Sequence, residues 1–302
     1  TMGVLRKTTD GTIVPLPARL LIGRARTSGL RLASTAASGE HASIVWTGDH
    51  WDIRDLGSTN GTLADTVRLE PGKPQKILRG AKLMFGGPDE AWVLEDDAAP
   101  DALALEVGTD EVVVARAGLL ALPSTGAPEL SVYKSTGGEW VAEDTEGDVR
   151  AVTDQAVVTA GGRAWRLHLP LSAEGTPMIE PGPTFATVKF VFRVSKNEEM
   201  IDISVVHKGR QIPLESREHG YVLLTLARVR KSEEHLSVGE RGWVDRDELL
   251  RMLGMDANGM NVAIHRARQQ LLAAGIEGAQ GIVEVRRGHR RFGTDRFEIT
   301  AI

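Results

Sequence analysis

The chain has 302 residues, of which 41% are hydrophobic and 25% charged, and this composition is typical of soluble globular proteins with two or three domains. No apolar run has the length of a membrane-spanning helix, and residues 1–20 lack the apolar core of a signal peptide. Cysteine is absent, which excludes disulfides and thiolate metal sites. We therefore expect a cytoplasmic protein with no membrane partner.

The net charge of −5 is unevenly distributed along the chain. Residues 186–302 hold 19 Lys and Arg against 16 Asp and Glu, whereas the remaining residues hold 17 against 25. Between Asn258 and Gly293 there are six Arg and two Glu. A basic stretch at the end of an acidic chain predicts a local binding site for a polyanion.

Residues 12–98 consist of short strand-like segments separated by Gly, Asp, Ser and Asn turns. Two examples are Ala42–Trp46 and Trp51–Asp55. Helical periodicity is weak in this region, so the pattern predicts an all-β sandwich.

Three segments of this region carry side chains that suit a phosphorylated peptide. They are Gly23-Arg24, then Ser38–His41 (SGEH), and then Asp55–Thr62 (DLGSTNGT). A guanidinium and neutral hydroxyl donors can bind a phosphate dianion. The Asn60 carboxamide can bond both the N–H and the C=O of a bound peptide, and Asn60-Gly61 is a strong hairpin signal that would hold it in place.

In these segments and their order, residues 12–98 resemble the forkhead-associated (FHA) domain. The resemblance implies a β-sandwich that binds phosphothreonine peptides, with Arg24 and Ser38 on the phosphate. It implies further that Thr59 lines the same pocket and that Asn60 holds the peptide backbone. Three residues would be structural and shape the loops: Gly23, His41 and Gly61.

One departure from the FHA pattern concerns the residues between Ser38 and His41. The family often has basic or neutral polar residues there, whereas this chain has Gly39 and Glu40. A carboxylate near the pocket would repel a phosphate. A sandwich that binds unphosphorylated protein, or that only packs internally, is therefore the alternative.

Residues 105–170 again read as short strands, with no recognisable chemistry, and we expect a β-rich middle segment of unknown role. Trp140 and Trp165 are expected in its core. Residues 171–184 contain three Pro and two Gly and predict a linker.

Residues 186–302 predict strands first, then helices, then two closing strands. The helices are expected at Ser216–Arg230, Asp245–Leu253 and Asn258–Ala274, and the closing strands at Gly281–Arg287 and Arg291–Ile299. Asp245 is a candidate N-cap of the second helix, and Gly254 contributes to the turn that follows it.

The third predicted helix has an apolar stripe of Ile264, Ala267 and Leu271 on one side. Its opposite side carries Asn261, His265, Arg266, Arg268 and Gln269. Arg, Asn and Gln side chains suit base edges in a DNA major groove. The hairpin that follows has four arginines near its tip, which suit phosphates or the minor groove: Arg286, Arg287, Arg290 and Arg291.

Over residues 200–300 the chain resembles the OmpR-type winged helix of bacterial response regulators. The resemblance implies that Asn258–Ala274 is the recognition helix, with Val262, His265, Arg266 and Arg268 nearest the DNA. The family's Gly-Tyr-Arg in the wing is replaced here by Arg290-Arg291-Phe292, which adds positive charge. The alternative is a winged helix that binds protein and leaves its arginines solvated.

The sequence therefore predicts a multidomain α+β protein: an FHA sandwich at 12–98, a β-rich segment at 105–170, a linker at 171–184 and a winged helix-turn-helix at 186–302. We expect a bacterial transcription regulator that binds a phosphothreonine-containing protein or Ser/Thr kinase and double-stranded DNA. A second copy of the chain, in a homodimer, is a further candidate partner. No enzyme activity, cofactor or metal is expected. The alternative function is an adaptor that does not bind DNA. We hypothesise further that the acidic N-terminal half covers the basic wing in an inactive state.

Overall fold

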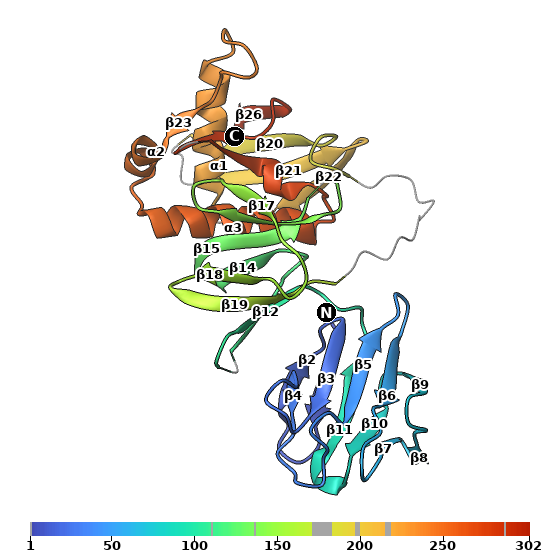
Figure 1. Ribbon diagram of the computed structural model, residues 1–302. Helices are drawn as coiled ribbons and strands as arrows, with labels where there is room; N and C mark the ends of the chain where they lie inside the picture. Colours follow the sequence, from blue (N-terminus) through green and yellow to red (C-terminus); the bar gives the residue numbers. More distant parts are fainter. Residues whose placement is uncertain are drawn as a thin grey trace. The chain divides into compact units, whose positions relative to one another are not determined.

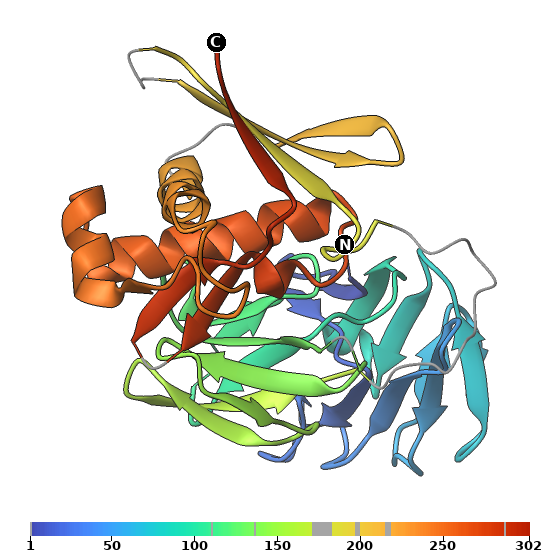
Figure 2. The ribbon, with the colours of Figure 1, turned by 90° about the horizontal axis from the view of Figure 1, so that it is seen from above.

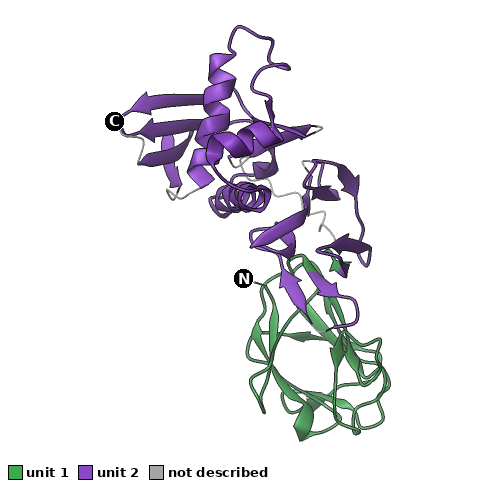
Figure 3. Cartoon of the chain, turned by 90° about the vertical axis from the view of Figure 1, so that its left-hand side faces the viewer, with its two compact units in different colours: residues 1–103, 167–174 green, residues 104–166, 175–302 purple. Residues whose placement is uncertain are grey.

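A computed structural model of the chain describes residues 2–109, 111–135, 137–170, 183–196, 200–214, 219–286 and 288–302 (Figure 1). The chain divides into two compact units, residues 1–103 with 167–174 and residues 104–166 with 175–302 (Figure 3). Most of the expected linker lies outside the described residues, as do Arg287 and the first residues of the helix expected at Ser216–Arg230.

The first unit holds a β-sandwich of two sheets. One sheet has the strand order β2-β1-β11-β10-β7-β8, and the other has the order β4-β3-β5-β6-β9. Their strands are β1 (Val4–Lys7), β2 (Ile13–Pro15), β3 (Arg19–Gly23), β4 (Leu30–Arg31), β5 (Ala42–Trp46), β6 (Trp51–Asp55), β7 (Thr62–Ala64), β8 (Val67–Arg68), β9 (Pro74–Ile77), β10 (Lys82–Phe85) and β11 (Ala91–Asp96). A short 3-10 helix, Pro88–Glu90, precedes β11.

Alternation of side chains along the strands builds the core of this sandwich. In β6, Trp51, Ile53 and Asp55 are buried, whereas the residues between them are not. The expected strands over 42–46 and 51–55 are confirmed. Strand β1 lies ahead of residue 12, where we expected the sandwich to start, because its short sequence VLRK carries no alternating pattern to reveal it.

The β-rich middle segment forms two four-stranded sheets, β13-β12-β19-β18 and β14-β15-β16-β17. Their strands are β12 (Leu103–Glu106), β13 (Val112–Val114), β14 (Leu120–Ser124), β15 (Ala127–Lys134), β16 (Trp140–Asp144), β17 (Val149–Ala151), β18 (Val157–Ala160) and β19 (Arg163–His168). Trp165 is fully buried, as expected, and its Nε1 donates to the carbonyl of Ala160. Trp140 is half-buried instead of lying in the core.

Over its described residues, the C-terminal part of the second unit contains a four-stranded sheet, three α-helices and a three-stranded sheet. The sheets have the orders β22-β21-β20-β26 and β23-β25-β24. The elements are β20 (Lys189–Val194), β21 (Ile201–His207), β22 (Arg210–Leu214), α1 (His219–Ser232), β23 (Val244–Asp245), α2 (Arg246–Leu253), α3 (Ala257–Ala273), the 3-10 helix Ala279–Ile282, β24 (Val283–Arg286), β25 (His289–Phe292) and β26 (Phe297–Ala301).

The prediction of a single strand over Arg291–Ile299 is wrong, because the chain turns between β25 and β26. Gly293 meets the backbone so closely that a Cβ there would lie 1.6 Å from the carbonyl oxygen of Gly281. The turn also places Asp295 on the buried Arg230 guanidinium, which donates to both carboxylate oxygens. Strand β26 then pairs with β20 in parallel.

Local signals in the sequence set the ends of α2. The Asp245 carboxylate accepts from the backbone N–H groups of Asp247 and Glu248, which confirms the predicted N-cap. Gly254 ends the helix in the left-handed conformation. None of the helices that the structure describes is long and apolar enough to cross a bilayer.

Helix α3 is covered on two sides. Its predicted apolar stripe of Ile264, Ala267 and Leu271 is buried, and α3 packs against α1. It also packs against β15 of the middle segment, where α3 and the green strands lie side by side in Figures 1 and 2. The polar side of α3 is therefore not a free surface throughout.

Candidate functional site

The three polar segments of the N-terminal sandwich meet at one group of loops. Arg24 directly follows β3, Ser38 lies in the loop before β5, and the turn between β6 and β7 carries Thr59 and Asn60. The backbone N–H of Thr59 donates to the Ser38 Oγ at 3.1 Å, and the backbone N–H of Arg24 donates to the Ser38 carbonyl at 2.9 Å. The Asn60 Nδ2 donates to the carbonyl of Ala36 at 2.8 Å. The structure thus places all four residues in one cluster.

The cluster presents unused donors to solvent. Arg24, Thr59 and Asn60 are exposed, and Ser38 is half-buried. The Arg24 Nε donates to the carbonyl of Ala37 at 3.1 Å, which fixes the guanidinium. Its two terminal nitrogens have no acceptor among the described residues, so they are free to form a bidentate pair with an oxyanion.

His41 connects two of these loops from the interior. Its side chain is fully buried, and its Nδ1 accepts from the backbone N–H of Ser38 at 3.0 Å. The Nε2 must then carry the hydrogen and donate to the carbonyl of Gly61 at 3.2 Å. Burial lowers the pKa of His41, so the ring is neutral and serves as a brace.

Two glycines shape the loops of the site. A Cβ on Gly23 would lie 2.1 Å from the carbonyl oxygen of Gly39, in the loop that carries Ser38. Gly61 has a φ of +84°, and a Cβ there would meet the Arg68 guanidinium at 2.6 Å. Gly23 therefore sets the spacing between two loops, whereas Gly61 is required for the left-handed backbone of its turn.

Asp55 is a structural residue of the site to which the sequence analysis assigned no role. It is 1% exposed, and its Oδ1 accepts from the backbone N–H groups of Gly57 and Ser58. Its Oδ2 accepts from the hydroxyls of Ser58 and Thr62, each at 2.6 Å. Burial alone would raise the pKa of Asp55, but these hydrogen bonds prevail and lower it. The ionised carboxylate therefore holds the turn that carries Thr59 and Asn60.

Glu90 is a second such residue, and no local signal marks it. It is 1% exposed, and its Oε1 accepts from the backbone N–H groups of Ala33 and Ser34. Its Oε2 lies 3.1 Å from the Lys7 ammonium. Glu90 thus anchors the start of the loop that leads to Ser38.

Comparison with known proteins agrees with this geometry. Residues 20–86 match the model of the FHA domain. Residues 20–86 form an FHA domain. The FHA domain-containing protein FhaB of Mycobacterium tuberculosis is 44% identical over 64 residues, which are 19% of this chain and 41% of that protein. FhaB of Mycolicibacterium smegmatis is 39% identical over 69 residues, 23% of this chain and 39% of the relative. The chain spans less than half of the length of these curated relatives.

Two solved structures are also similar to part of this chain. One is Mycobacterium tuberculosis EmbR in complex with a low-affinity phosphopeptide, with 27% identity over 33% of this chain and 25% of that chain, at a TM-score of 0.30. Another is the FhaA FHA domain in a complex, with 25% identity over 30% of this chain and 97% of that chain, at a TM-score of 0.28.

The second predicted set, on α3 and the hairpin, does not share one exposed face. His265, Arg268 and Arg290 are 2%, 5% and 1% exposed, so the prediction that they face solvent is wrong. Arg266 and Arg286 are exposed. Three further members are half-buried: Asn261, Val262 and Arg291. Arg287 lies outside the described residues.

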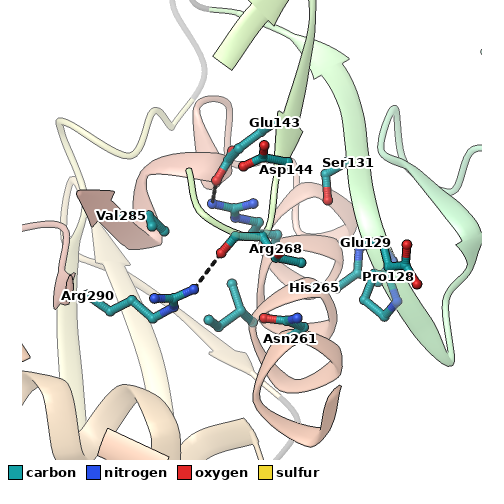
Figure 4. A pocket seen from close by; sticks show the side chains of 12 residues that line it. Pro128, Glu129, Ser131, Glu143, Asp144, Asn261, His265, Arg268, Val285 and Arg290 are labelled. Atoms are coloured by element: carbon teal, nitrogen blue, oxygen red, sulfur yellow. Dashed lines mark hydrogen bonds and ion pairs between the residues drawn. The ribbon is translucent and has the colours of Figure 1, made fainter. Parts of the chain in front are cut away.

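The buried members of this set have partners in the middle segment or lie beside it. The Arg268 Nη2 donates to the Glu143 Oε1 at 2.9 Å, and the Arg290 Nη2 donates to the carbonyl of Thr145 (Figure 4). Arg291 instead pairs with Glu284 and stacks on the Trp243 ring. In the part of the chain that the structure describes, no three His, Asp or Glu side chains gather to hold a metal ion.

We expect the stability of the second unit to depend on pH through His265. Burial, together with Arg268, Arg116 and Arg266, lowers the pKa of His265 from 6.5 to about 4. The folded state therefore favours neutral histidine, and the unfolded chain binds more protons between these values. We expect the free energy of unfolding to rise with pH across this window, by about 3 kcal/mol from this group.

The measurement is urea unfolding at about pH 5 and pH 7, followed by far-ultraviolet circular dichroism, which reports the helices of this unit. His265→Gln should show a smaller change with pH than the unmodified chain. His235→Gln, at an exposed position, is the matched control. Equal pH dependence in all three proteins would contradict the assignment.

Proposed function

We propose that the chain is a phosphothreonine-dependent binding protein and not an enzyme, with its FHA domain as the reader. The observation that carries the proposal is the convergence of Arg24, Ser38, Thr59 and Asn60 on one exposed group of loops. The partner would be a threonine-phosphorylated protein or the Ser/Thr kinase that modifies it.

Each side chain has a distinct part in this proposal. The terminal nitrogens of Arg24 donate to two phosphate oxygens, and the hydroxyls of Ser38 and Thr59 donate to a third. Asn60 already uses one N–H on the carbonyl of Ala36, which fixes the carboxamide plane. Its Oδ1 then accepts from a backbone N–H of the peptide.

The test uses the intact chain and a pool of fluorescent peptides that share a fixed phosphothreonine within degenerate sequence. Polarisation should report binding to this pool and none to the same pool with unmodified threonine. A pool with fixed phosphoserine tests whether the threonine methyl group matters. Equal binding to the phosphorylated and unphosphorylated pools, or binding to neither, would refute the proposal.

Glu40 should weaken phosphate binding without abolishing it. Its side chain is exposed, and water screens the repulsion between its carboxylate and a bound phosphate. Glu40→Gln is expected to tighten phosphothreonine binding by roughly 2- to 5-fold at low salt, and by less at high salt. Polarisation titrations at two salt concentrations measure this. Glu70→Gln is the control, since Glu70 is exposed and pairs with Lys73. An unchanged or lower affinity for Glu40→Gln would contradict the electrostatic argument.

A second candidate function is DNA binding by the C-terminal part, which would make the chain a phosphothreonine-dependent transcription regulator. Its support is a group of cations on α2, α3 and β25, namely Arg246, Arg268 and Arg290. Val244 of β23 pairs with Arg290 of β25, and Arg246 follows β23 directly, so two of these charges lie close together. Burial and then Arg246 lower the pKa of Arg290. Such a cluster suits the phosphates of duplex DNA. Without DNA binding, the chain would be a phosphoprotein adaptor.

A further inference from the structure

Three cations of the second unit, Arg246, Arg268 and Arg290, contact one acidic turn. Residues 143–148, with the sequence EDTEGD, end β16 and lead to β17, and we call them the acidic turn. Four of its six residues are carboxylates. Figure 4 shows Glu143 and Asp144 on one side of a small cavity, with Arg268 and Arg290 on the other.

The acidic turn contacts each of the three arginines. The Glu143 Oε1 accepts from Arg268 at 2.9 Å, and both side chains are buried. The carbonyl of Thr145 accepts from the Arg290 Nη2. The Glu146 Oε1 accepts from the Arg246 Nη1 at 3.0 Å in a more exposed pair. Carboxylate and carbonyl oxygens thus occupy the positions at which phosphate oxygens would bind these cations.

Neighbouring contacts hold the turn in place. A Cβ on Gly147 would lie 2.6 Å from the Val285 Cβ, so the backbone of the turn packs directly on β24. The Tyr133 hydroxyl donates to the Glu143 Oε2 at 2.7 Å, which orients the carboxylate. Leu272 of α3 packs against Leu119, Tyr133 and Val141.

The covered arrangement leaves donors unused. The donors Arg290 Nε, Arg290 Nη1 and Arg268 Nε are buried and have no protein partner among the described residues, and the same holds for the His265 ring nitrogens, of which one is a donor and one an acceptor in the neutral ring. They border a cavity of about 40 Å³. A buried donor without a partner destabilises the state that contains it, because it has lost its bonds to water. The arginines are therefore incompletely paired in the covered state and would gain bonds from a ligand rich in oxyanions.

We propose that the acidic turn is an intramolecular cover that competes with DNA phosphates for Arg246, Arg268 and Arg290, and so inhibits DNA binding. This inference rests on the second candidate function. The sequence analysis hypothesised that the whole acidic N-terminal half covers the basic wing. The present proposal assigns the covering role to residues 143–148 alone. Displacing the turn exposes the cationic face of α3 and β25.

The test compares the intact chain with Glu143→Gln/Glu146→Gln, which keeps side-chain shape but removes the two carboxylates paired with arginines. Binding to a fluorescent mixed-sequence duplex of about 30 base pairs is measured by polarisation at low salt. The variant should bind at least about 10-fold more tightly. The matched control is Glu139→Gln/Asp148→Asn, which removes two exposed carboxylates of the same segment that form no ion pair among the described residues.

A second variant guards against misfolding of the interior. Glu146→Lys alters only the more exposed pair and should raise DNA affinity in the same direction. Adding Arg268→Ala to the double Gln variant should reverse the gain, because it removes a cation of the released face. Phosphothreonine-peptide affinity should stay unchanged throughout and reports separately on the FHA domain.

Two results would overturn the inference in distinguishable ways. If the unmodified chain or the control binds duplex as tightly as the double Gln variant, the turn is not a cover, although DNA binding stands. If hydrogen exchange shows faster exchange of α3 amides in the double Gln variant and yet no duplex binds, DNA binding itself fails, and the inhibitory role with it.

Discussion

Arg24→Ala is expected to weaken binding of a phosphothreonine peptide by at least about 100-fold. The substitution removes two charge-assisted hydrogen bonds to the phosphate, each worth about 1.5–3 kcal/mol. The Arg24 side chain is exposed, and among the described residues its hydrogen-bond partner is the carbonyl of Ala37, so the fold should keep its stability. Isothermal titration with the intact chain measures the affinity, and thermal unfolding measures the stability.

Two further variants sharpen this result. Arg24→Lys keeps the charge but loses the planar fork, so it should recover only part of the affinity. Arg54→Ala removes an exposed arginine of β6 in the same domain and should leave affinity unchanged. If Arg24→Ala binds as tightly as the unmodified chain, or if Arg54→Ala is equally weak, Arg24 is not the phosphate ligand.

Asp55→Ala should lower both the stability of the FHA domain and its affinity for phosphothreonine peptide. The substitution leaves the backbone N–H groups of Gly57 and Ser58 and the buried hydroxyl of Thr62 without their acceptor. Several lost bonds to a buried carboxylate predict a loss of about 2–4 kcal/mol in the free energy of unfolding. The turn that presents Thr59 and Asn60 then loses its anchor.

The way in which the free energy of unfolding changes with pH identifies the contribution of the Asp55 carboxylate. Because the folded-state pKa of Asp55 is lowered, the stabilisation is present above the unfolded-state pKa and is lost as pH falls through the folded-state value. Chemical denaturation between about pH 2 and pH 6 should therefore show a smaller acid-induced loss in Asp55→Ala than in the unmodified chain. Asp89→Ala, at an exposed position, is the control. Asp55→Ala with unchanged stability would contradict the role of the turn anchor.

Asn60→Ala distinguishes a residue that contacts the peptide from one that holds the turn in place. Its side chain is exposed, so the substitution should reduce peptide affinity with little change in stability, whereas Asp55→Ala changes both.

The FHA loops were predictable because their chemistry is local. Glycine turns, the Asn60-Gly61 hairpin signal and the alternation along β5 and β6 are each readable over a few residues. Asp55 and Glu90 are harder to recognise, because their roles depend on partners brought by the fold. The Oε1 of Glu90 binds backbone groups of residues 33 and 34, and no pattern in the sequence connects positions so far apart.

The burial of the polar side of α3 could not be predicted from the sequence. Helical periodicity identified the side that faces the core, because apolar residues recur there. It could not distinguish a solvated polar side from one that is covered by another element. His265 and Arg268 are buried because β15 and the acidic turn pack on them, and Glu143 lies 125 positions away from Arg268.

Amide NMR spectra of the intact chain, titrated with a phosphothreonine peptide and with its unphosphorylated form, address the central claim most directly. We predict that the phosphorylated peptide shifts the resonances of Arg24, Ser38, Thr59 and Asn60, and that the unphosphorylated peptide leaves them in place. Shifts that are the same for both peptides, or that fall on other strands while these four resonances stay unchanged, would contradict the account.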